Sequence, residues 1–152
     1  MSKRKKYLLF GIIGIVLIAI MFSYYKIPIN ADTVFSERNL NKVDSIQFGD
    51  YKDDGWVHYF EVDFKKPAEI KRILKTFDQT KYTRVLEQSN IYNDGKFLSM
   101  YLGPNTVILT INEHGFLRID EHTYKLTDHQ LQIFNELYKI LVADHKPVNE
   151  MY

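Results

Sequence analysis

The hydrophobic positions of the chain begin with one long uninterrupted run. No charged residue occurs from Tyr7 to Tyr25, a run of 19 residues in which Ser23 is the only strongly polar one. A helix rises about 1.5 Å per residue, so the run would extend for roughly 28 Å, close to the thickness of a bilayer's hydrocarbon core. A helix buried in a soluble protein would usually carry a polar stripe, which this run lacks. The pattern therefore predicts a transmembrane helix over residues 7–25.

The flanks of this run predict its processing and its orientation. A cleaved signal peptide is the main alternative, since it also combines a basic start with an apolar middle. Small residues should then mark a cleavage site, but Ala31 has Ile29 two positions before it. Basic residues fill positions 3–6, whereas only Lys26 closely follows the run. Because positive residues stay on the cytoplasmic side, we expect a cytoplasmic tail at 1–6, an uncleaved span and a domain outside the cytoplasm.

Beyond the span, apolar positions follow shorter periods. Residues 26–42 are polar and unpatterned, which predicts a tether that could be ordered near Val34 and Phe35. Apolar and polar residues alternate in several runs bounded by turn residues, and these predicted strands are 43–48, 56–64, 82–88, 96–102, 106–112 and 116–120. Helical spacing predicts two further elements, at 70–77 and 131–141. We therefore expect residues 43–152 to form an α+β domain, an antiparallel sheet of about five to seven strands with two helices packed on one face.

The stretch from Asp50 to Glu61 supports two incompatible interpretations. Aligned with the calcium-binding loop of an EF-hand, it offers Asp50, Asp54 and Glu61 as metal ligands. An EF-hand loop lies between helices, however, whereas both flanks here alternate as strands, and Lys52 would direct an ammonium group toward the cation. The alternation favours a β-hairpin with its turn around Gly55.

Composition and motifs exclude several classes of chemistry. The chain has no cysteine, which excludes a thiol nucleophile, a thiolate metal site and disulfide bonds. The sequence contains no phosphate-binding loop, no serine-hydrolase motif and no HExxH zinc motif. It indicates no cofactor. We therefore expect that the protein is not an enzyme.

Two arrangements keep an enzymatic alternative open. Three histidines near acidic residues could bind zinc, although polar strand ends explain them equally well: His114, His122 and His129. Cleavage of a glycoside needs two carboxylates across a cleft, and Glu61 or Asp63 could pair with Glu87. Nothing in the sequence distinguishes these acids from the other acidic residues of the chain.

Aromatic residues are abundant, with 11 tyrosines and 10 phenylalanines. Five aromatic residues near strand ends could form a surface that stacks on sugars or peptides: Tyr51, Trp56, Tyr59, Tyr92 and Tyr101. Core packing and cross-strand pairs would account for the same residues. The sequence leaves both interpretations open.

Charge and overall plan give the functional expectation. All 19 acidic residues and 16 of the 20 basic residues lie beyond residue 25, a formal net charge of −3 that gives no basic surface for nucleic acid. The plan of a basic start, one apolar span and a small outer domain resembles that of membrane-anchored proteins of the Gram-positive cell envelope. That resemblance implies an extracytoplasmic accessory role. We expect a non-catalytic binding or accessory module whose partners are the membrane and an envelope protein or cell-wall polymer; a small envelope hydrolase or metal-dependent enzyme is the alternative.

Overall fold

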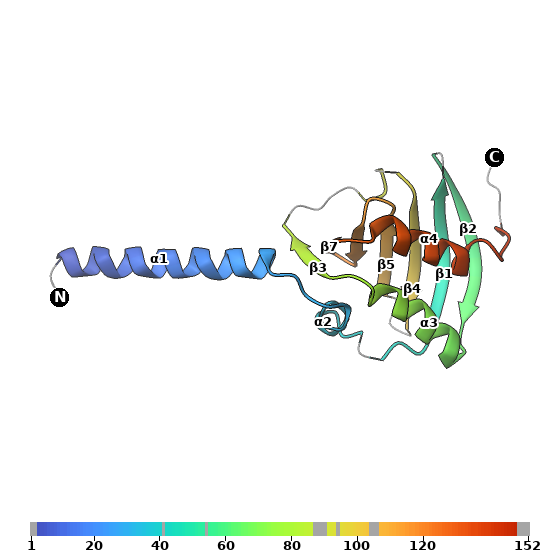
Figure 1. Cartoon of the computed structure of the whole chain (residues 1–152), viewed down its shortest axis with the longest axis horizontal. Helices are drawn as coiled ribbons and strands as arrows, with labels where there is room; N and C mark the ends of the chain where they lie inside the picture. The colour runs from blue at the N-terminus through green and yellow to red at the C-terminus, as the bar shows by residue number, and fades with distance from the viewer. Residues whose placement is uncertain are drawn as a thin grey trace.

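The computed structural model describes residues 3–40, 42–53, 55–86, 91–93, 95–103 and 107–148. Within these residues the chain forms four helices and seven strands (Figure 1). The helices are α1 (Lys3–Lys26), α2 (Ala31–Glu37), α3 (Pro67–Phe77) and α4 (Gln130–Leu141). The strands are β1 (Ile46–Asp53), β2 (Trp56–Phe64), β3 (Tyr82–Val85), β4 (Phe97–Leu102), β5 (Val107–Asn112), β6 (Phe116–Ile119) and β7 (His122–Leu126).

All seven strands belong to one antiparallel sheet. Their order across the sheet is β2-β1-β4-β5-β6-β7-β3, so the two edge strands are β2 and β3. Four neighbouring pairs are consecutive hairpins, whereas β1 with β4 and β7 with β3 pair over longer stretches of chain. The predicted α+β class and the antiparallel sheet are confirmed.

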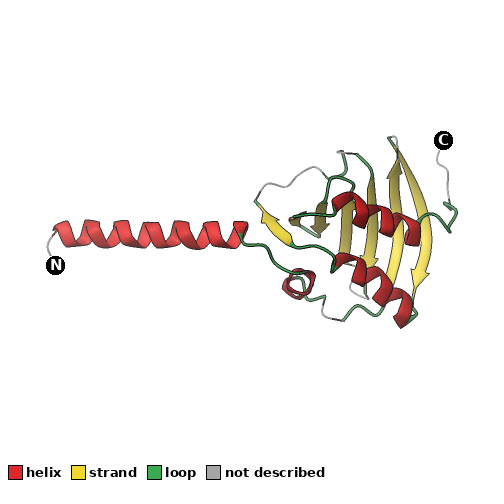
Figure 2. Cartoon of the chain, in the orientation of Figure 1, coloured by secondary structure: helices red, strands yellow, loops and turns green. Residues whose placement is uncertain are grey.

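Two amphipathic helices cover one face of this sheet (Figure 2). α3 buries Ile70, Ile73 and Phe77, and α4 buries Ile133 and Leu137 among its apolar residues. Burying a side chain of this size stabilises the fold by about 1.5–3 kcal/mol relative to leaving it exposed. The predicted arrangement of two helices on one face is therefore confirmed.

The stretch with two interpretations is the β1–β2 hairpin. Asp53 pairs with Trp56, so two residues form the turn, and Gly55 has a φ of 88°. A two-residue hairpin turn needs positive φ, which glycine adopts without a steric penalty. The hairpin prediction is confirmed, and strands rather than EF-hand helices flank the turn; Asp54 lies outside the described residues.

The stretch expected to be a tether is instead partly folded into the domain. α2 buries Ala31, Val34 and Phe35, and the ring of Phe35 lies 5.7 Å from the ring of Phe77 in α3. Three apolar residues in a seven-residue helix are too few to give a recognisable period. The packed domain therefore begins before residue 43, at Ala31.

Edge strand β3 pairs with β7 on one side and with the segment before α2 on the other. Ile29 and Tyr82 form an antiparallel bridge, in which each amide nitrogen lies 2.8 Å from the other residue's carbonyl oxygen. This bridge covers part of a strand edge that would otherwise offer free backbone groups. The strand that pairs with β3 on the other side, β7, was not predicted as a separate strand, because β7 is short and follows β6 closely.

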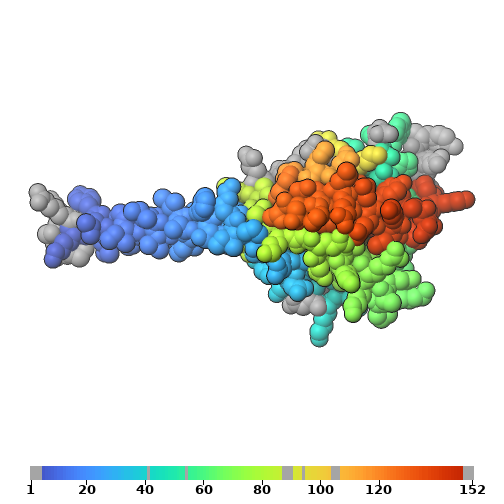
Figure 3. Space-filling model, in the orientation of Figure 1, coloured from blue at the N-terminus to red at the C-terminus, as the bar shows by residue number. Residues whose placement is uncertain are grey.

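α1 projects from the domain as a straight rod, and its C-terminal end meets β3 (Figures 1 and 3). Its 24 residues correspond to about 36 Å of helix. It is the one helix in the described part of the chain that is long and apolar enough to cross a membrane. Its most apolar stretch has a mean hydropathy of 2.4, and none of that stretch is buried. α1 is therefore not a core helix of the domain.

Candidate functional site

The sheet face opposite α3 and α4 is not covered by a helix in the described part of the chain (Figure 2). Side chains alternate across a strand, so residues between the core positions of β1, β2, β4 and β5 point to this face, which we call the open face. Its central residues include Asp50, Tyr59, Ser99, Tyr101 and Thr110. The hydroxyl oxygens of Ser99 and Thr110 lie 2.8 Å apart and are buried beneath it.

A β-bulge at Gly49 shapes the open face. The register of β1 shifts between Phe48 and Asp50 against both of its neighbours. Between these positions β1 has one residue more than β4 and one fewer than β2. The irregularity directs Asp50 to the open face, where its register partner on β2 is Tyr59. The ring of Tyr101 lies against Gly49, since a Cβ at that position would be only 2.6 Å from the ring carbon Cε2. Glycine is required here so that Tyr101 can lie across β1.

The electrostatics of this face are set by burial and by neighbouring groups. Burial raises the pKa of the Asp50 carboxyl above its usual value. Burial likewise raises the pKa of the Tyr101 hydroxyl, and interactions with Asp50, Tyr92 and Tyr59 raise it further. The geometry explains these interactions, because Asp50 and Tyr59 are register partners and the Tyr101 ring lies against Gly49, next to Asp50. The phenol hydroxyls can donate hydrogen bonds, the Asp50 carboxylate can accept them, and the rings can stack on a flat ligand.

Contacts from three strands hold Tyr92 at this face. The ammonium of Lys52 donates a hydrogen bond of 2.7 Å to the Tyr92 carbonyl oxygen. The Tyr92 ring lies 5.2 Å from the Phe97 ring in an edge-on arrangement. The guanidinium carbon of Arg118 lies 5.8 Å from the centre of the Tyr92 ring. β1, β4 and β6 therefore position an aromatic ring that comes from outside the sheet.

The predicted aromatic surface is brought together only in part. Tyr59 and Tyr92 are 39% and 37% exposed and lie near Tyr101 on the open face. Tyr51 lies on the helix-covered face, where it is buried and packs 5.3 Å from the ring of Tyr138 in α4. Trp56 is exposed, but it lies an even number of residues from the core residues Phe60 and Phe64 of β2 and so projects toward the helix side. Tyr51 and Trp56 therefore do not belong to this surface.

The histidines of the zinc alternative lie at different element ends. His114 lies in the β5–β6 turn, where its carbonyl oxygen accepts a 3.1 Å hydrogen bond from Lys125. His122 begins β7, and His129 precedes α4 with a φ of 53°. Among the described residues, no group of three or more histidine, aspartate or glutamate side chains is arranged to hold a metal ion.

The carboxylate candidates are only partly described by the structure. Asp50 and Glu61 lie on the open face of neighbouring strands, and Glu61 and Asp63 alternate with the core residues of β2. Glu87 and Asp54 lie outside the described residues. The structure therefore identifies no catalytic pair of carboxylates among the residues that it describes.

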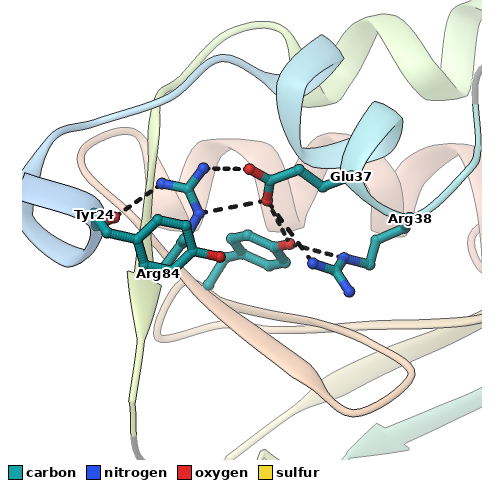
Figure 4. Close-up of polar contacts among 5 residues, drawn as sticks. Tyr24, Glu37, Arg38 and Arg84 are labelled. Atoms are coloured by element: carbon teal, nitrogen blue, oxygen red, sulfur yellow. Dashed lines mark hydrogen bonds and ion pairs between the residues drawn. The ribbon is translucent and has the colours of Figure 1, made fainter. Parts of the chain in front are cut away.

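A cluster of polar contacts not predicted from the sequence joins α1 to the domain (Figure 4). The guanidinium of Arg84 on β3 donates to the Tyr24 carbonyl oxygen at 2.9 Å, and its central carbon lies 4.1 Å from the centre of the Tyr24 ring. The same guanidinium forms a two-point ion pair with Glu37 at the end of α2. Arg84 therefore connects the last turns of α1 and α2, and we call this cluster the joint.

Further contacts fix the acidic member of the joint. The hydroxyl of Tyr124 donates to Glu37 at 3.3 Å, and Arg38 donates to that hydroxyl oxygen at 3.1 Å. Burial raises the pKa of Glu37, but the hydrogen bond and charge of Arg84 outweigh it, so the net pKa is lowered. Glu37 is therefore held as a carboxylate. The sequence gives no signal for a pair whose members are 47 residues apart.

Comparison of the chain with protein-family models, with curated protein sequences and with solved structures gave no match. The features of the molecule that bear on function are therefore the open face, the joint and α1.

Proposed function

We propose that the protein is a membrane-anchored, non-catalytic binding module of the bacterial cell envelope. In this proposal α1 crosses the membrane, its basic N-terminal end stays in the cytoplasm and the domain lies outside. Two observations support the anchoring. The apolar stretch of α1 is not buried against the domain, and the joint attaches the C-terminal end of α1 to β3 and α2. A soluble domain would expose this apolar surface to water at a large cost in free energy.

The binding role is supported by the grouping on the open face. Asp50, Tyr59, Tyr92 and Tyr101 combine one acceptor with three phenols on a face without helix cover. Tyrosines offer large rigid contact area together with a hydroxyl for hydrogen bonding, which suits recognition of sugars and peptides. We take the partner to be an envelope protein or a cell-wall polymer. The convergence of these side chains is the observation on which the binding role depends.

Photo-crosslinking from the open face tests this role in intact cells. A photoreactive phenylalanine analogue replaces Tyr59, which is 39% exposed, and a control places it at Leu131, which is 58% exposed on α4. We expect an adduct from position 59 that is absent at position 131 and that is lost when Tyr101→Ala is added. Equal labelling from both positions, or adducts from position 131 alone, would show that the open face is not the binding surface.

A further inference from the structure

A cleft of about 610 Å³ separates the end of α1 from β3. Its α1 wall includes Ile18 and Phe22, and its β3 wall includes Val85 and Leu86. Leu86 is 75% exposed, although it directly follows a strand that contacts α1. The cleft is therefore largely apolar and open to the medium that surrounds the end of α1.

The depth of this cleft in a bilayer follows from the proposed span, on which this inference rests. Ile18 precedes Tyr25 by seven residues, or about 10 Å along a helix axis. The polar layer on each side of a bilayer is roughly 5–8 Å thick. With Tyr25 at the interface, Ile18 and Phe22 lie at the level of the acyl chains. Leu86, which lines the same cleft, then lies close to that level.

The joint keeps the two walls together. Arg84 binds both the Tyr24 carbonyl and the Glu37 carboxylate, so β3 stays beside the last turns of α1. Lys26 also lines the cleft, and no ion pair links it to another described residue. The site thus combines apolar walls with a cation at the level of the headgroups, which matches a phospholipid with its acyl chain and its phosphate.

We infer that the β3 end of the domain inserts into the outer surface of the membrane, and that the cleft holds one acyl chain of a membrane phospholipid. Leu86 and Val85 contact the chain from the domain side, and Ile18 and Phe22 contact it from the span. Lys26 lies near the phosphate. The domain is thereby held in one orientation on the bilayer, with β2 at the far edge of the sheet.

Quenching of tryptophan fluorescence by brominated lipids tests this inference on the full chain. The chain has one tryptophan, Trp56, on β2, six strand spacings from β3 or about 29 Å. A Leu86→Trp variant in a Trp56→Phe background places the probe at the cleft instead. Both proteins are reconstituted in phosphatidylcholine and phosphatidylglycerol vesicles, with and without bromine on the acyl chains.

We expect Leu86→Trp to lose roughly half of its emission in the brominated vesicles, because side chains at such an interface reach about 5–10 Å into the headgroup and acyl boundary. Native Trp56 should be unaffected. Unquenched Leu86→Trp in protein that still floats with the vesicles overturns the inference and leaves the anchoring intact, whereas failure to float overturns the proposed anchoring. Disulfide dimers of Leu86→Cys in vesicles would identify a second copy as the occupant and also overturn it.

Discussion

Replacing Arg84 with alanine should loosen the attachment of the domain to α1 and destabilise the domain. The substitution removes the ion pair with Glu37, the hydrogen bond to the Tyr24 carbonyl and the contact with the Tyr24 ring. Glu37 keeps its contacts with Tyr124 and Arg38, so its carboxylate is not left alone. The decrease in the free energy of unfolding is therefore smaller than for removal of one partner of a fully buried ion pair.

The size of the effect follows from these contacts. A hydrogen bond to a charged group contributes about 1.5–3 kcal/mol when it is well shielded from water. The side chains of Arg84 and Glu37 are 13% and 24% exposed, so solvent screening reduces this contribution. With a further ~0.5 kcal/mol for the ring contact, we expect a loss of about 2 kcal/mol. For a domain of this size, that corresponds to a decrease in Tm of about 8 °C.

Thermal unfolding of the full chain in detergent micelles, followed by near-ultraviolet circular dichroism, measures this change. The matched control is Arg72→Ala, which removes an exposed arginine of α3 and should change stability by no more than about 0.5 kcal/mol. Because the pKa of Glu37 is lowered, its contribution is complete above its ordinary value of 4.5 and is lost as pH falls through the lower folded value. The two variants should therefore differ most at neutral pH, and the difference should shrink in acid to the part contributed by the Arg84 contacts with Tyr24. Equal melting temperatures at pH 7 would refute the stabilising role of the joint.

Three further predictions follow from the hairpin, the open face and the N-terminal helix. Gly55→Ala places a side chain at a φ of 88° and should cost about 1 kcal/mol, with calcium leaving the melting curve unchanged; a calcium-dependent rise in Tm would contradict the hairpin account. Asp50→Asn should raise Tm at pH 7, because burial raises the Asp50 pKa and thus disfavours the charged form of Asp50 in the folded protein. The gain in Tm should vanish below pH 3.8, and a lower Tm of the variant at pH 7 would contradict the burial of the Asp50 charge. Intact-mass analysis should find a mature chain that still includes Tyr7, whereas a soluble product beginning near Ala31 would identify residues 1–30 as a signal peptide.

Local periodicity was enough to predict most of the elements. The i, i+3, i+4 spacing of Ile70, Ile73 and Leu74 predicted α3, and the alternation after Gly55 predicted β2. Both signals arise because a single element must bury one side of itself, whatever lies beyond it. The fold class could therefore be predicted from the hydrophobic periodicity of each helix and strand considered separately.

The open face and the joint depend on features that the periodicity of a single helix or strand does not reveal. Strict alternation from Phe48 would place Tyr51 on the open face and Asp50 in the core, but the bulge at Gly49 reverses both. The pairing of Glu37 with Arg84 depends on β3 lying at the sheet edge beside α1 and α2. Such pairings are set by the tertiary arrangement, which leaves no periodic signal in the sequence.

The most direct test of the account is the topology of α1 in cells. The chain has no cysteine, so single-cysteine variants report position without further changes. Ser2→Cys marks the N-terminal side, and Asp144→Cys marks an exposed position beyond α4. With a membrane-impermeant maleimide on intact protoplasts, we expect labelling of Asp144→Cys at once and of Ser2→Cys only after lysis. Labelling of Ser2→Cys in intact protoplasts, or protection of Asp144→Cys, would contradict the proposed anchoring and orientation.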